Sequence, residues 1–183
     1  MMKATGITRK IDELGRIVIP KEIRRTLRIR EGTPLEIFTE KNGEIILRKY
    51  SPMGELVTFA VQYADSLAQT TGMMVCITDL EQVIAAAGGA KRDYLGKQIS
   101  DQLDQLIEER MTSQASPEEK NYVAIIKEPM EEKYAQTISP IICQGDVIGS
   151  VILMGKDSKT KMGELEKKLS YCAAGFLGRQ MEE

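Results

Sequence analysis

Residues 12–25 read DELGRIVIPKEIRR, and this stretch decides the fold of the first part of the chain. The branched apolar residues at 17–19 favour a short strand. Pro20 ends that strand, because proline has no backbone N–H for a sheet, and it suits the first position of a helix. The pattern therefore predicts a short strand over 16–19 and a short helix over 20–29.

The predicted helix has one apolar face and one basic face. Ile23 and Leu27 are four residues apart and share a side of the helix. Arg24 and Arg25 fall off that stripe and are expected to face outward. The chain thus presents arginine to solvent directly after the short strand.

Hairpins are predicted on both sides of this helix. Before it, residues 6–11 alternate apolar and polar side chains and predict a strand that turns at 12–15. After it, strands are predicted over 35–41 and 44–50, because Asn-Gly at 42–43 strongly favours a two-residue hairpin turn. In that register Lys41 and Glu44 flank the turn with opposite charges.

The first 50 residues differ in charge from the rest of the 183-residue chain. They hold five Lys and seven Arg against seven acidic residues, a net charge of +5, whereas residues 51–183 have a net charge of −7. A basic segment on an acidic body points to an anionic partner for that segment alone. Charge by itself leaves a merely solvated basic surface as an equal alternative.

The basic segment is too small to bury a core of its own. About fifty residues with two short hairpins and one helix leave several strand edges unpaired. We therefore expect an obligate homodimer through residues 1–50, in which the hairpins of two copies interleave.

The composition changes at residues 51–55, which we interpret as a linker between a domain over 1–50 and a domain over 56–183. Periodicity predicts that the second domain is a mixed or antiparallel sheet with flanking helices, so the whole chain is an α+β protein of two domains. The predicted helices cover 55–72, 99–111 and 162–183. The predicted strands cover 73–79, 82–89, 121–126, 134–142 and 147–155, with a tight turn at 143–147.

Both long helices carry apolar stripes, and we expect each stripe to lie on its own sheet over most of its area. In the first long helix the stripe consists of Leu56, Phe59, Ala60, Tyr63 and Leu67. In the last helix the apolar residues follow heptad spacing, which leaves room for a helical interface with another chain. They are Met162, Leu165, Leu169, Cys172 and Phe176.

Several classes of chemistry are excluded or disfavoured. Histidine is absent, which excludes a Ser-His-Asp triad, a Cys-His pair and a His-ligated zinc site. Neither GxGxxG nor GxxxxGK[ST] occurs, and we expect no cofactor and no metal. Cys76, Cys143 and Cys172 lack CxxC spacing and have apolar neighbours, so we expect reduced, buried thiols. No apolar run has the length of a membrane span and no secretory signal is visible, which favours the cytoplasm and argues against a membrane partner.

Residues 3–50 resemble the DNA-binding domain of the AbrB family of bacterial transition-state regulators over nearly their whole length. The resemblance implies an interleaved, swapped-hairpin β-barrel dimer that binds double-stranded DNA with basic residues from strand, turn and helix. The positions that match the family's DNA-contacting residues are Arg9, Lys10, Arg16, Arg24 and Arg25. Guanidinium groups suit phosphates and guanine edges, and a dimer would present about eight of them on one two-fold face. An arginine can instead pair with Asp12, Glu13 or Glu22, and we expect this of one of the four.

Residues 56–183 resemble GAF domains in the order of their helices and strands. The two parts together resemble regulators of forespore gene expression in spore-forming Bacillus relatives. The resemblance implies a nucleoid-associated homotetramer, in which the GAF-like domains hold two DNA-binding dimers together. Because a fold does not fix a function, two roles stay open for the GAF-like domain: sensing of an unknown small-molecule effector, or oligomerisation alone.

Two alternatives to a DNA-binding transcription regulator are kept. Antitoxins that repress their own genes use the same N-terminal fold, but they usually add a short disordered tail rather than a folded domain. A cysteine-based enzyme of the GAF class would need a low-pKa thiol, and neither Cys76 nor Cys143 has Lys, Arg or His beside it. We therefore expect a transcription regulator without enzyme activity.

Overall fold

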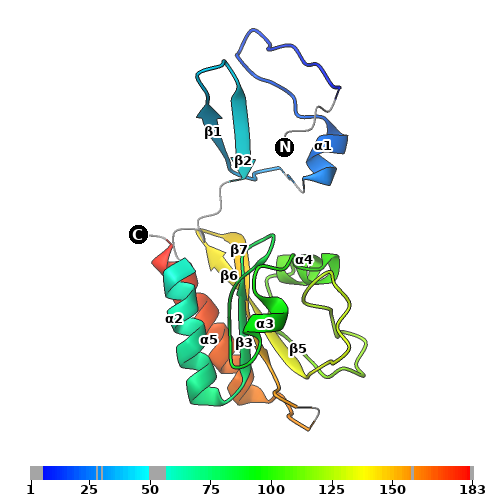
Figure 1. The fold of residues 1–183 in the computed structure, drawn as a ribbon, viewed down its shortest axis with the longest axis vertical. Coiled ribbons are helices and arrows are strands. Elements are labelled where there is room, and N and C mark those ends of the chain that lie inside the picture. The colour runs from blue at the N-terminus through cyan, green and yellow to red at the C-terminus, as the bar shows by residue number, and fades with distance from the viewer. Residues whose placement is uncertain (1–5, 28, 30, 50–56, 158, 182–183) are drawn as a thin grey trace. The chain divides into compact units, whose positions relative to one another are not determined.

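The computed structural model describes residues 6–27, 29, 31–49, 57–157 and 159–181 (Figure 1). The chain divides into two compact units, Met1–Tyr50 and Ser51–Glu183. The linker predicted at 51–55 lies outside the described residues. Within the described part of the chain, no helix is long and apolar enough to cross a membrane.

In the described residues of the first unit there is one helix and one two-stranded sheet (Figure 1). The helix α1 spans Lys21–Thr26, and Pro20 is its N-cap residue rather than its first helical residue. The strands β1, Leu35–Thr39, and β2, Ile45–Lys49, pair antiparallel. The helix and the second hairpin predicted from the sequence are therefore formed.

The β1–β2 turn differs from the prediction by one residue. The N–H of Glu40 donates to the carbonyl of Glu44 at 3.0 Å, and the N–H of Gly43 donates to the carbonyl of Glu40 at 3.0 Å. The loop therefore has three residues, and its last residue, Gly43, has a φ of +84°, in the left-handed region that glycine favours. Lys41 lies inside the loop, so its predicted place opposite Glu44 is wrong.

The strands predicted over 6–11 and 16–19 are not formed within one chain. Both segments lack regular secondary structure, and the turn between them is closed by the Asp12 N–H, which donates to the carbonyl of Arg16 at 3.0 Å. A strand needs a ladder of successive bonds to a neighbour. Among the described residues of this chain, no strand pairs along these two segments.

The second unit is built on a five-stranded antiparallel sheet in the order β4-β3-β7-β6-β5. Its strands are β3 (Met74–Thr78), β4 (Val83–Ala87), β5 (Ser113–Ala115), β6 (Gln136–Cys143) and β7 (Asp146–Met154). Gln144 and Gly145 form the two-residue turn between β6 and β7, and both have positive φ. The strand predicted over 121–126 is absent, because Ile126 forms only an isolated bridge with Ile99.

Helices cover both faces of this sheet (Figure 1). The long helices α2 (Val57–Thr71) and α5 (Glu164–Gln180) lie on one face. The short helices α3 (Lys91–Tyr94) and α4 (Asp101–Glu108) lie on the other. Alternate residues of the central strands fill the two cores. Val75, Ile77, Val151 and Leu153 pack under α2 and α5, and Cys76, Ile138 and Ile152 pack on the opposite face.

Most of the residues that the two long helices bury against the sheet are small. The buried residues are Ala60, Ala64 and Ala68 in α2, and Ser170, Ala173, Ala174, Leu177 and Gly178 in α5. They let the helices approach the sheet closely, since a Cβ on Gly178 would lie 2.1 Å from the carbonyl oxygen of Ile142. The expectation that the apolar stripes lie on the sheet is correct only in part. Ala60 is buried and Tyr63, Leu67, Met162 and Leu169 pack against the core, whereas Phe59, Leu165 and Phe176 are exposed.

Candidate nucleic-acid interface

Helix α1 places two of the predicted arginines next to each other on the surface. Arg24 and Arg25 stand in its last turn, and both side chains are exposed. No residue of α1 is buried, so in one chain the helix offers surface rather than core. Basic side chains in the last turn also suit the negative end of the helix dipole.

The turn that precedes α1 is held by the carboxylate of Asp12. It accepts hydrogen bonds from the N–H of Leu14 at 3.0 Å, from the N–H of Arg16 at 2.8 Å and from Nε of Arg16 at 2.7 Å. The hydrogen bonds from the Arg16 backbone and side chain hold the pKa of the Asp12 carboxyl below its ordinary value, so this pair is charged at neutral pH. Arg16 is thus the arginine that pairs with an acidic neighbour.

Arg9 and Lys10 lie before this turn, and both are exposed. Within the described part of the chain, Arg9, Arg24 and Arg25 take part in no ion pair, so their charges are unpaired at the surface. One copy of the unit therefore carries the five predicted basic residues on three segments. They are the residues before the turn, the end of the turn and the last turn of α1.

The first unit also exposes many apolar side chains. Among its described apolar residues only Pro20 is buried, and Leu14 and Val18 are 74% and 72% exposed. The other exposed apolar residues are Ile7, Ile11, Ile17, Leu27, Ile37, Ile45 and Leu47. Exposed apolar side chains in this number are typical of a unit that packs against a partner.

Arg48 is a basic residue that the sequence patterns do not single out. Its guanidinium carbon lies 4.8 Å from the centroid of the Phe38 ring, which places the cation over the ring face. The two residues are diagonal neighbours across the hairpin, because Arg48 is opposite Glu36 and Phe38 is opposite Ile46. The sequence misses this contact because a register shifted by one residue puts Arg48 and Phe38 on opposite faces.

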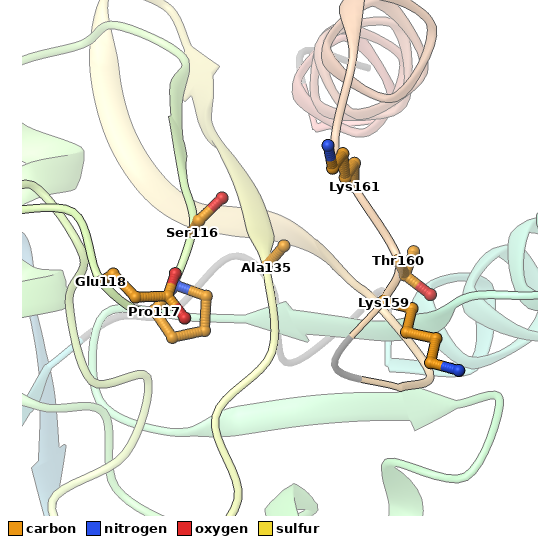
Figure 2. Close-up of a pocket in the computed structure, with 7 residues that line it drawn as sticks. All are labelled: Ser116, Pro117, Glu118, Ala135, Lys159, Thr160 and Lys161. Carbon is orange, nitrogen blue, oxygen red and sulfur yellow. The ribbon is translucent and has the colours of Figure 1, made fainter.

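The second unit has a cavity of about 350 Å³ beside the start of β6 (Figure 2). Its walls come from 116–118, from the loop at 159–161 that precedes α5, and from Ala135. The polar groups are the ammonium groups of two lysines, one carboxylate and two hydroxyls, of which the Thr160 hydroxyl already donates to Asp157 at 2.8 Å. This lining suits a small polar molecule with an anionic group rather than an apolar ligand.

The three cysteines differ in accessibility. Cys76 is fully buried in β3, and burial raises the pKa of its thiol, which keeps it protonated. Cys143 is half-buried and Cys172 is exposed on α5, so the expectation of buried thiols is correct for Cys76 alone. Within the described residues, no group of three or more His, Cys, Asp or Glu is arranged to hold a metal ion.

Comparison with known proteins finds a family match for each part of the chain. Residues 55–182 match a family model described as stage V sporulation protein T C-terminal, transcription factor, and residues 8–55 match antidote-toxin recognition MazE, bacterial antitoxin. Stage V sporulation protein T of Bacillus subtilis (strain 168) is 50% identical over 182 residues, which cover 100% of both chains.

Two further similarities cover part of the chain each. Transition state regulatory protein AbrB of the same organism is 45% identical over 85 residues, which cover 46% of this chain and 88% of that protein. The GAF domain of Thermosynechococcus elongatus PixJ has a TM-score of 0.56 at 11% identity, and covers 73% of this chain and 89% of its own. At that identity the match shows the fold alone, and the second unit has a GAF-like fold.

The fold and these matches define a two-domain transcription regulator with an AbrB-like N-terminal domain and a GAF-like C-terminal domain. The chain belongs to the stage V sporulation protein T family of sporulation transcription factors.

Proposed function

We propose that this transcription factor binds double-stranded DNA through the basic residues of its first unit. The residues are Arg9, Lys10, Arg16, Arg24 and Arg25. The observation that carries the proposal is their exposure: an acidic chain keeps a net charge of +5 in its first 50 residues and leaves these side chains at the surface. Exposed guanidinium groups without acidic partners are suited to phosphates and guanine edges.

The DNA-binding form is a dimer in which the hairpins of two copies interleave. The support is energetic, because the first unit alone leaves most of its described large apolar side chains exposed to water. The segment at 16–19 has a strand sequence but belongs to neither sheet of the described residues, and a second copy would supply a strand for it to pair with. Dimerisation would also present each arginine twice about a two-fold axis.

In this proposal phosphate contacts supply most of the affinity, and DNA shape supplies part of the specificity. Helix α1 has only six residues, which is too short to lie along the major groove and read several base pairs. Specificity then depends on a few arginine contacts to base edges and on how readily the DNA adapts to the protein surface.

The test is binding of the full-length protein to a DNA duplex recovered by in vitro selection. Arg24→Ala should weaken binding at least tenfold in about 100 mM salt, with little change in melting temperature because the side chain is exposed. Lys41→Ala removes an equal charge from the β1–β2 loop and should change the affinity less than threefold. Equal effects of the two variants would contradict the assigned face.

The GAF-like domain is proposed to join two such dimers into a tetramer. Leu165, Cys172 and Phe176 follow heptad spacing on α5, point away from the sheet and are exposed, as is Phe59 on α2. A stripe of this kind is suited to packing against the same stripe of another chain.

The same domain is proposed to bind a small-molecule effector in the cavity bordered by Lys161 and Glu118. The two lysines in the lining favour a carboxylate or phosphate group on that molecule. A screen of anionic metabolites by thermal shift tests the idea, since a ligand that binds the folded state raises its melting temperature. If no metabolite stabilises the wild type more than Lys161→Ala, the domain has an assembly role alone.

The MazE-type match over residues 8–55 favours an antitoxin as the second candidate function. A folded domain follows that segment, in place of a short tail that could wrap a toxin. A toxin gene beside the coding sequence, and a complex of its product with this chain, would support the antitoxin role. We propose instead a cytoplasmic, nucleoid-associated regulator that acts in the forespore and has no enzyme activity.

A further inference from the structure

Asp12 stabilises the turn before α1 with both its carboxylate and its backbone. Both of its carboxylate oxygens are used: Oδ1 accepts the N–H of Leu14 at 3.0 Å and the N–H of Arg16 at 2.8 Å, and Oδ2 accepts Nε of Arg16 at 2.7 Å. Its backbone closes the same turn, because the Asp12 N–H donates to the carbonyl of Arg16 and its carbonyl accepts the N–H of Gly15. One residue therefore fixes the turn and the arginine at its end.

The contact with Asp12 leaves the two terminal nitrogens of the Arg16 guanidinium available. Asp12 engages Nε, and within the described part of the chain neither terminal nitrogen of the guanidinium forms a hydrogen bond. The Arg16 side chain is 69% exposed, so its four terminal N–H groups face solvent. When only Nε is engaged, the two terminal nitrogens remain free to form bidentate hydrogen bonds with a guanine edge or a phosphate.

We propose that Asp12 is a positioning residue for DNA recognition. Its carboxylate fixes the orientation of the Arg16 guanidinium. Arg16 then contributes to sequence specificity as well as to electrostatic attraction. This rests on the proposed DNA-binding function of Arg16. A fixed guanidinium can match a base edge only in one orientation, whereas a freely rotating one can reach phosphates of any sequence.

For one substitution, the proposal and simple electrostatics predict opposite changes in DNA affinity. Asp12→Asn keeps an oxygen that can accept the two backbone N–H groups, but it removes the charged partner of Nε. It also removes one negative charge near the DNA, which by charge alone strengthens binding to every sequence. Glu13→Gln is the matched control, because it removes the same charge one residue away and the exposed Glu13 makes no hydrogen bond with the described residues.

The experiment measures binding of full-length variants to a selected duplex and to a scrambled duplex of the same composition. Glu13→Gln should strengthen binding to both duplexes by the same small factor. Asp12→Asn should match Glu13→Gln on the scrambled duplex and bind the selected duplex about tenfold more weakly than Glu13→Gln does. Equal binding of the two variants to both duplexes would overturn the proposal.

A second background separates this inference from the proposed function. In an Arg16→Ala protein, Asp12→Asn and Glu13→Gln should be indistinguishable on the selected duplex, because the group that Asp12 positions is gone. A remaining tenfold difference there would show that Asp12 acts through the turn rather than through Arg16, and would overturn the inference alone. If Arg16→Ala itself binds the selected duplex like the wild type, the assigned role of Arg16 in DNA binding fails as well.

Discussion

Tyr63 of α2 and Phe176 of α5 stack with their ring centroids 5.2 Å apart and their planes at 13°. The stack joins the two long helices, with Tyr63 partly buried against the core and close to Cys172. Burial first, and Cys172 second, raise the pKa of the Tyr63 phenol above its ordinary value. Because Phe176 of the stack and Phe59 of α2 are both exposed, we expect another chain to pack on this surface of the two helices.

Phe176→Ser should break the proposed tetramer into dimers, because it removes an exposed aromatic ring from this surface. Light scattering coupled to size-exclusion chromatography measures the mass directly. Tyr171→Ser is the control, since Tyr171 is also exposed on α5 but points to a different side of the helix. A tetramer that survives Phe176→Ser would place the interface elsewhere.

Replacement of two glycines of α5 by alanine should change the free energy of unfolding in opposite directions. Gly178→Ala places a methyl group 2.1 Å from the carbonyl oxygen of Ile142 and should lower the free energy of unfolding by about 1–3 kcal/mol. Gly175→Ala meets no atom within 4 Å and should raise it by up to about 1 kcal/mol through better helix propensity. Urea denaturation of both variants measures the difference. Equal effects would mean that α5 does not approach β6 as closely as described.

The cysteines should differ in reactivity in the native protein. Cys172 is exposed and should react with a disulfide reagent within minutes, whereas Cys76 should react only on unfolding. Raising the pH from about 7 to 9 should not accelerate Cys76, because burial holds its thiol pKa above the ordinary value. If Cys76 of a Cys172→Ser protein still reacts rapidly with the disulfide reagent, a cysteine-based enzyme would again be a candidate function.

The parts of the fold that depend on local chemistry are predictable from the sequence. Pro20 and the residues after it predict α1, and Ser100 predicts the start of α4, where its hydroxyl accepts the N–H of Leu103 at 2.9 Å. The Gln144-Gly145 turn follows from the same kind of signal.

Features that depend on packing are not predictable in this way. Ala64 and Ala68, which the predicted stripe leaves out, are buried against the sheet, because small side chains allow close approach, whereas Phe59, which the stripe includes, is exposed. The loop before β2 has one residue more than an Asn-Gly turn suggests, and that residue decides which side chains meet across the hairpin. The basic residues are visible in the sequence, but the way Asp12 holds Arg16 depends on the turn geometry.

The salt dependence of DNA affinity tests the central claim most directly. The logarithm of the association constant of the full-length protein should fall linearly with the logarithm of salt concentration. Arg25→Ala should make that slope shallower by about two, because a dimer loses two phosphate contacts of about one unit each, whereas Lys41→Ala should leave the slope unchanged. An affinity that does not depend on salt, or equal slopes for the wild type and Arg25→Ala, would contradict DNA binding through the basic residues of the first unit.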